Sequence, residues 1–228
     1  MKAAPPPATR KKKILIVDDH PLLREGLTRL INRQPDLLVC GEAGTTPEAL
    51  AAVRKHPPDI ALIDISLPGS DGFVLTQALQ ARRHKVPVLM FSMHDEWVYA
   101  ERALQAGARG YIMKQEPTED CLHAIRQVLA GEIAVSRAMT NQLAHRLSTA
   151  GSRTPIDQLS HRELEIFQLF GAGRTSREIA SSLHLSIKTI EAHRANICQK
   201  LSLHGTPDLL RQATYFVQDE RHPPTGVT

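Results

Sequence analysis

The segment that most constrains the fold covers residues 58–72 and contains a short apolar stretch that ends in an acid. The stretch Ile60–Ile63 is rich in aliphatic residues and does not alternate with polar ones, which is typical of a parallel strand buried on both faces. Proline and glycine in residues 67–72 force the chain to turn soon after Asp64. Ligands of doubly wound sheets bind outside the carboxyl ends of strands, where this carboxylate would lie. An isolated aspartate here would equally well cap a turn, so the interpretation depends on the other strands.

Strand and helix patterns alternate through residues 12–131. The predicted strands cover residues 14–17, 37–43, 60–63, 86–92 and 109–114. The predicted helices cover residues 21–31, 47–55, 72–82, 95–105 and 117–130. Five strands that alternate with five helices predict an α/β fold, a doubly wound five-stranded parallel sheet with helices on both faces.

Acidic residues follow two of the predicted strands. Asp18 and Asp19 end the first strand, and Asp64 ends the third. The carboxyl ends of parallel strands meet at one edge of a sheet, so we expect the three carboxylates to converge there. Crowded like charges raise one another's pKa unless a cation neutralises them, and an all-oxygen site suits Mg²⁺. The sequence therefore predicts a magnesium site at this edge.

Two further strand ends supply a hydroxyl and an ammonium group. Ser92 ends the fourth predicted strand and Lys114 ends the fifth. Beside a metal-bound carboxylate, these groups are suited to hold the oxygens of a phosphoryl group. Each alone has a simpler interpretation, Ser92 as a turn residue and Lys114 as a charge at a strand end. Their common place at the edge with the three acids favours the functional interpretation.

With this pattern, residues 12–131 resemble the receiver domain of two-component response regulators. The residues that carry the resemblance are Asp18, Asp19, Asp64, Pro68, Asp71, Gly72, Ser92, Gly110, Tyr111 and Lys114. The resemblance implies that a sensor histidine kinase phosphorylates Asp64. It also implies that Mg²⁺ is bound by Asp19, Asp64 and the backbone carbonyl of Ser66, with Asp18 assisting.

The same resemblance assigns roles to three more residues. Ser92 and Lys114 would contact the phosphoryl oxygens, and Tyr111 would be the aromatic switch that turns inward on activation. A receiver assists only its own phosphorylation and dephosphorylation and is otherwise not an enzyme. Gln115 stands where many receivers have a proline, which affects only the shape of that loop.

From residue 157 onward the pattern contains helices only. Capping boxes at residues 160–163 and 175–178 begin two helices, Ser186 caps a third that runs to about Leu201, and a fourth ends near Gln218. Two capped helices joined by a short turn predict a helix-turn-helix, whose second helix enters the major groove of DNA. Residues 157–218 would thus form a small all-α domain, and residues 132–156 a linker.

Residues 157–218 resemble the LuxR-type helix-turn-helix, so the whole chain resembles the NarL/FixJ response regulators. The motifs are residues 159–163, 171–173, 178–180, 185–197 and 200–201. In the third helix Ile190, Ile197 and Leu201 form the predicted buried stripe. Expected base-contacting residues are Glu191, Ala192, Ala195, Asn196 and Gln199, and expected phosphate contacts are Lys188, Thr189, His193, Arg194 and Lys200.

Charge, cysteine spacing and hydropathy limit the functions and locations that this chain can have. Residues 155–218 hold seven Lys/Arg against six Asp/Glu, so charge alone would favour a protein-interaction bundle over DNA binding. The three cysteines are widely spaced, which excludes a disulfide framework or zinc cluster and suits a reducing compartment. No apolar stretch approaches membrane-spanning length. We therefore expect a cytoplasmic protein with no membrane partner.

The leading hypothesis is a transcription regulator switched by phosphorylation, which as a homodimer reads inverted half-sites in promoter DNA. The first alternative is a Mg²⁺-dependent aspartyl-phosphate phosphohydrolase. Such enzymes need a second acid two residues after the nucleophile, and this chain has Ser66 there. The second alternative, a regulator that senses a small organic ligand, requires an apolar, aromatic-lined pocket. Aromatic residues are only 4% of this chain, which disfavours it.

Overall fold

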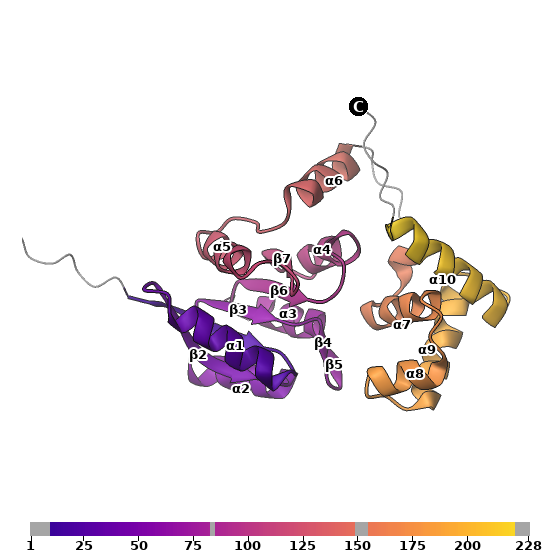
Figure 1. Cartoon of the computed structure of the whole chain (residues 1–228), viewed down its shortest axis with the longest axis horizontal. Helices are drawn as coiled ribbons and strands as arrows, with labels where there is room; N and C mark the ends of the chain where they lie inside the picture. Colours follow the sequence, from indigo (N-terminus) through magenta and orange to yellow (C-terminus); the bar gives the residue numbers. More distant parts are fainter. Residues whose placement is uncertain (1–9, 83–84, 149–154, 222–228) are drawn as a thin grey trace, which may run out of the picture. The chain divides into compact units, whose positions relative to one another are not determined.

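The computed structural model of the chain describes residues 10–82, 85–148 and 155–221 (Figure 1). They form two compact units, which divide between Ala144 and His145. The first unit contains the sheet and the second contains helices. Residues 149–154 of the predicted linker lie outside the described residues.

The first unit is built on a five-stranded sheet in which all neighbouring strands are parallel. Across the sheet the strands are β2 (Leu37–Ala43), β1 (Lys12–Val17), β3 (Ile60–Ile63), β6 (Val88–Ser92) and β7 (Gly110–Met113). The central strand β3 is buried along its whole length. Its continuous apolar sequence fits this place, because both faces of the strand meet other elements. The predicted doubly wound sheet is confirmed.

Helices cover both faces of this sheet. They are α1 (Pro21–Asn32), α2 (Thr46–Lys55), α3 (Gly72–Gln80), α4 (Glu96–Gln105) and α5 (Thr118–Leu129). On one face, Leu27 of α1 and Ile125 of α5 belong to the same buried cluster as Leu62 of β3. On the other face, the Thr76 hydroxyl of α3 lies 3.5 Å from the sulfur of Met90 in β6. The amphipathic helices therefore protect the sheet from water on two sides.

The turn that follows Asp64 is more regular than the sequence predicts. Residues Ser66–Leu67 (β4) and Ser70–Asp71 (β5) pair as a small antiparallel hairpin. Gly72 then passes so close to the strand end that a Cβ atom on it would lie 2.1 Å from the Asp64 carbonyl oxygen. Only glycine fits there, and its close approach holds the start of α3 beneath Asp64.

The segment after α5 adds to the outer edge of β7. The Tyr111 amide donates to the Ala134 carbonyl at 2.8 Å, and the Ala134 amide donates to the Arg109 carbonyl at 2.9 Å. The Ser136 amide donates to the Glu96 carboxylate at 2.7 Å. Helix α6 (Arg137–Ser148) follows. The start of the predicted linker thus belongs to the first compact unit.

The second unit contains the 3₁₀ turn η1 (Pro155–Gln158) and helices α7 (His161–Gly171), α8 (Ser176–Ser182), α9 (Ile187–Lys200) and α10 (Thr206–Arg221). Both predicted capping boxes are present, at the starts of α7 and α8, and Ser186 caps α9 as predicted. The buried core includes Phe167 of α7 together with Ile190 and Ile197 of α9. The predicted helical domain is therefore confirmed.

Helix α10 closes this core. Leu209 and Ala213 are buried, and the ring of Phe216 lies 5.8 Å from that of Phe167. Leu209 and Ala213 therefore belong to the core, and Phe216 packs against it half-buried. Leu210 and Tyr215 remain 38% and 66% exposed.

Replacing Gly110 with alanine should loosen the segment added to β7. A Cβ atom at Gly110 would lie 2.5 Å from the Ala134 carbonyl oxygen and 2.9 Å from Leu89. We expect the first unit to lose about 1–3 kcal/mol of unfolding free energy, as overpacked cores do. Hydrogen exchange at the Tyr111 and Ala134 amides should accelerate. Gly26→Ala is the control, because nothing lies within 4 Å of its new methyl group. Protection unchanged in Gly110→Ala would contradict the expectation.

Candidate functional site

The three predicted acids converge at the carboxyl edge of the sheet. Asp18 follows β1 and Asp64 follows β3, and these two residues are 1% and 3% exposed. One ligand atom from each of Asp18, Asp19, His20 and Asp64 lies within 4.8 Å of the others. The convergence follows from parallel pairing, because β1 and β3 are neighbours in register.

Lys114 joins the two buried acids. Its Nζ lies 2.6 Å from Asp18 Oδ2 and 2.7 Å from Asp64 Oδ2. Its backbone amide donates to the Ser92 carbonyl at 2.7 Å, which extends the pairing of β6 with β7 by one residue. An ammonium that is almost fully buried between two carboxylates neutralises part of their charge.

His94 connects the remaining predicted residues. Its backbone amide donates to Ser92 Oγ at 3.2 Å, and its ring Nε2 lies 3.1 Å from Ser66 Oγ. The Tyr111 hydroxyl donates to the His94 carbonyl at 2.8 Å. Tyr111 is therefore already turned inward in this structure. Burial raises the pKa of its hydroxyl, which stays protonated and remains a donor.

Two residues that the sequence did not reveal, His20 and Arg24, contact Asp18 and Asp19. His20 Nδ1 lies 3.1 Å from Asp18 Oδ1 and 2.7 Å from Asp19 Oδ1. Arg24, one turn into α1, donates from Nη1 to the Asp18 carbonyl at 2.5 Å. The one sign of these contacts in the sequence is that His20 and Arg24 follow Asp18 and Asp19 within six residues. His94 had no comparable signal, because its partner Ser66 is 28 residues away.

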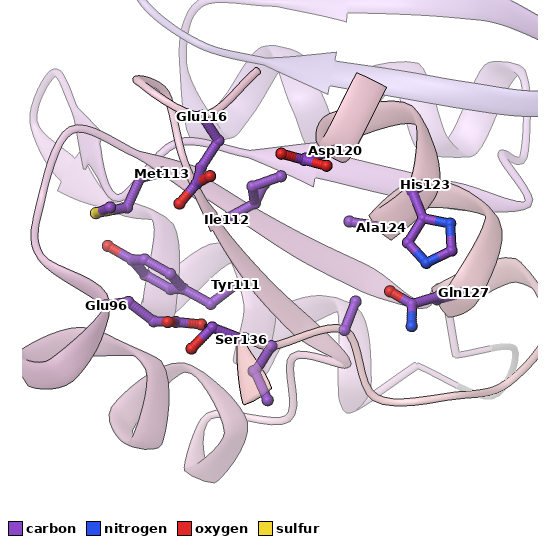
Figure 2. Close-up of a pocket in the computed structure, with 12 residues that line it drawn as sticks. Glu96, Tyr111, Ile112, Met113, Glu116, Asp120, His123, Ala124, Gln127 and Ser136 are labelled. Atoms are coloured by element: carbon purple, nitrogen blue, oxygen red, sulfur yellow. The ribbon is translucent and has the colours of Figure 1, made fainter. Parts of the chain in front are cut away.

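A pocket of about 230 Å³ lies beside this site, between α5, β7 and the start of α4 (Figure 2). Tyr111 and Glu96 line one side, and Asp120 and His123 of α5 line another. Its lining contains the phenol ring of Tyr111, three carboxylates and one imidazole, and it contains no Phe or Trp. This does not match the apolar, aromatic-lined pocket that the ligand-sensing alternative requires.

The predicted recognition helix α9 presents a polar face. Lys188, Ala192, Ala195, Asn196 and Gln199 are exposed, and Thr189, Glu191, His193 and Arg194 are partly buried. Ile190, Ile197 and Leu201 form the opposite, buried side, as predicted. The small side chains at the centre of the exposed face would allow the helix to approach a groove closely.

Several of the predicted phosphate contacts already have partners within this unit. Arg194 pairs with Glu191, and Lys200 Nζ lies 2.6 Å from Glu163 Oε2. The Thr189 hydroxyl lies 2.8 Å from that of Ser186. Burial lowers the pKa of His193, which would therefore carry little positive charge at neutral pH. The exposed Lys188 is the predicted cation nearest the start of α9.

Both units match known families. Residues 14–126 match the response regulator receiver domain, and residues 157–213 match the luxR family of bacterial regulatory proteins. The oxygen regulatory protein NreC of Staphylococcus aureus is 37% identical over 208 residues, which cover 88% of this chain and 96% of NreC. The chain is a response regulator of the NarL/FixJ type.

Solved structures of similar proteins agree with this fold. A LuxR-family two-component response regulator from Aurantimonas sp. SI85-9A1 is 36% identical, with a TM-score of 0.56 over 60% of this chain and 99% of its own. RcsB of Salmonella enterica serovar Typhimurium, bound to the promoter P1flhDC, is 23% identical. Its TM-score is 0.56, and the match covers 89% of this chain and 97% of that chain. The likeness to RcsB concerns the fold alone.

The regulator is a DNA-binding transcription factor with a receiver, and phosphorylation-based switching fits that receiver. It is not a hydrolytic enzyme of the kind considered as the first alternative. None of the helices within residues 10–82, 85–148 and 155–221 is long and apolar enough to cross a membrane.

Burial dominates the electrostatics of the acid site. It raises the pKa of Asp64 to about 6, even though the Lys114 ammonium acts in the opposite direction; the charge of Asp18 adds to the increase. For Lys114, burial lowers the pKa, but the charges and hydrogen bonds of Asp64 and Asp18 outweigh it, so the pKa is raised. A positively charged group at this edge of the sheet would therefore stabilise the ionised form of the buried Asp64 carboxylate.

The raised pKa of Asp64 predicts a pH dependence of stability in Mg²⁺-free buffer. The folded state holds this proton up to a pH of about 6, and the unfolded state releases it near 3.8. Unfolding is therefore increasingly favoured as pH rises from about 4 to 6, by on the order of 2–3 kcal/mol.

Asp64→Asn should remove this contribution, so the variant becomes relatively more stable than the wild type across that interval. Fluorescence of Trp97, the single tryptophan, reports unfolding of the first unit during urea titration. A difference between the two proteins that does not change with pH would contradict the assignment.

Proposed function

We propose that Asp64 accepts a phosphoryl group from a sensor histidine kinase and that this switches DNA binding by the second unit. The observation that carries the proposal is the buried contact of Lys114 with both Asp18 and Asp64, at 2.6 and 2.7 Å. A phosphoryl group on Asp64 adds negative charge beside this ammonium, so Lys114 would gain a new partner in the modified state. A state is favoured only through such differential contacts.

The acid cluster also fits a divalent cation. The carboxylates of Asp18, Asp19 and Asp64 offer oxygen ligands within 4.8 Å of one another, the set that Mg²⁺ prefers. We assign Asp19, Asp64 and the Ser66 carbonyl as direct ligands, with Asp18 assisting. Bound Mg²⁺ would neutralise charge on the transferred group. The protein side chains do the positioning, since Arg24 fixes the Asp18 backbone and Ser66 lies in the hairpin after Asp64.

Ser92 and Tyr111 complete the proposed switch. Ser92 is fully buried at the end of β6, where its hydroxyl would meet a phosphoryl oxygen. Its hydroxyl accepts from the His94 amide, and the His94 carbonyl accepts from Tyr111. The Tyr111 hydroxyl also has a side-chain hydrogen bond with Ser92. A change of partner at Ser92 would therefore reach Tyr111 both directly and through His94. The receiver would assist only its own phosphorylation and dephosphorylation.

Asp64→Asn should abolish phosphorylation. Incubation of the wild type with acetyl phosphate and Mg²⁺ is expected to add one phosphoryl group by intact mass, and the variant should add none. Asp59→Asn is the matched control: Asp59 precedes the other end of β3, where its carboxylate accepts from the Lys13 amide. It should be labelled like the wild type. Uptake of label by Asp64→Asn at the wild-type rate would overturn the assignment.

For the second unit we assign the exposed face of α9 to promoter DNA. Glu191, Ala192, Ala195, Asn196 and Gln199 would face the bases, and Lys188, Thr189, His193 and Arg194 are the candidate phosphate contacts. The receiver would cover residues 12–131, the linker residues 132–156 and the DNA-binding domain residues 157–218. We expect the regulator to act in the cytoplasm, where kinase and promoter DNA are accessible.

A homodimer is the expected DNA-bound form. The second unit carries almost no net charge, seven Lys/Arg against six Asp/Glu in residues 155–218, so one copy gathers little non-specific affinity. Linking two copies raises the affinity by about 10²–10⁴ without new base contacts. Tyr215 of α10 is 66% exposed and would supply a two-fold contact. Phosphorylation at Asp64 would favour this dimer on two inverted half-sites.

Tyr215→Glu should prevent pairing. The phosphorylated wild type is expected to sediment as a dimer and to protect two half-sites in footprinting. The variant should stay monomeric and bind about 10²-fold more weakly. Gln158→Glu, an equal charge change at the exposed turn η1, is the control. A wild-type monomer that protects one half-site with full affinity would exclude the dimer.

A further inference from the structure

The Lys200 ammonium forms an ion pair with a residue of the second unit itself. Its Nζ is 2.6 Å from Glu163 Oε2, although the residues are 37 positions apart. Lys200 ends α9, and Glu163 lies in the first turn of α7. The contact therefore joins the far end of the recognition helix to the beginning of the helix that packs against it.

Glu163 is a fixed anchor for this contact. Its side chain is 5% exposed, and Oε2 also accepts the Ser160 amide at 2.7 Å as part of the capping box. Burial alone would raise the pKa of Glu163, but the hydrogen bonds from Lys200 and Ser160 outweigh it, and the pKa is lowered. The carboxylate is therefore charged, and the cap of α7 fixes its position independently of Lys200.

The position of Lys200 on α9 agrees with this contact. Lys200 and His193 are seven residues apart, so they lie on the same flank of the helix. His193 also senses the charges of Glu163, Arg162 and Lys200. The centre of the exposed face, at Ala192, Ala195 and Gln199, points in a different direction, because Ile190 and Ile197 define the buried side.

We propose that Lys200 is a positioning residue that fixes the end of α9 against α7 through Glu163, rather than a phosphate contact. The inference rests on the proposed binding of DNA by α9. An ammonium has three protons, so a second partner is sterically allowed. Its charge, however, is already balanced by Glu163. Binding of DNA would therefore release no further counterion on account of Lys200.

The dependence of DNA affinity on salt separates the two roles. The phosphorylated full chain is titrated with a short duplex enriched by in vitro selection with the wild type, at several salt concentrations. Lys200→Met should lower the affinity at least about threefold at every concentration and leave the log–log slope unchanged. Lys188→Met, the matched loss of an exposed lysine on α9, should reduce the slope by about 0.9 per bound chain. A reduced slope in Lys200→Met would overturn the inference.

Glu163→Gln provides a test of opposite sign. The amide oxygen can still accept from the Ser160 amide, so the cap of α7 is kept while the pair with Lys200 is lost. If Lys200 acts through Glu163, this variant loses DNA affinity. The double variant Glu163→Gln/Lys200→Met then binds DNA no more weakly than either single variant. If Lys200 contacts a phosphate, removing the competing carboxylate raises the affinity and overturns the inference.

Lys200→Arg keeps the charge and should restore most of the wild-type affinity, which excludes a general folding defect; failure of this rescue counts against the inference. Thermal unfolding of each variant confirms that the titrations are made on folded protein. A wild type that binds the enriched duplex no better than a scrambled one would overturn the proposed function itself, whatever the variants do.

Discussion

The first unit depends on one buried ammonium between two buried carboxylates. Lys114 reaches Asp18 and Asp64 at once, so the ends of β1, β3 and β7 are tied together at a single point. Neither acid would be tolerable alone, because burial without a partner costs several kcal/mol per ion. The buried part of the site is under-neutralised, with two carboxylates and one ammonium. That imbalance makes the edge receptive to a cation and responsive to a change in charge on Asp64.

Local patterns made much of this predictable. The continuous apolar stretch at residues 60–63 is typical of a buried strand, and parallel topology brings its terminal Asp64 to the same edge as Asp18 and Lys114. The capping boxes at Ser160 and Thr175 were visible because both partners lie within four residues. The stripe of Ile190 and Ile197 followed from helical spacing. In each case the interacting residues are close together in the sequence, or the sheet topology brings them together.

The features that the sequence did not reveal depend on tertiary contacts. His94 meets Ser66 across 28 residues, and Lys200 meets Glu163 across 37. Lys200 was expected at a phosphate because an exposed lysine on a recognition helix has no local sign of an internal partner. The packing of Phe216 in α10 on Phe167 in α7 is likewise a contact between residues far apart in the sequence. Periodicity shows that a side chain faces inward or outward, but not which distant group it meets.

The segment around Ala134 has a further consequence for the free edge of the sheet. A strand with unpaired amides and carbonyls is a template for pairing with other chains, and natural proteins cover or shorten such edges. Here Ala134 occupies the outer side of β7 at Gly110, with hydrogen bonds to Arg109 and Tyr111. A receiver ending at Gly131 would leave this edge bare. The residues that follow α5 therefore also cover part of a sheet edge that another chain could otherwise pair with.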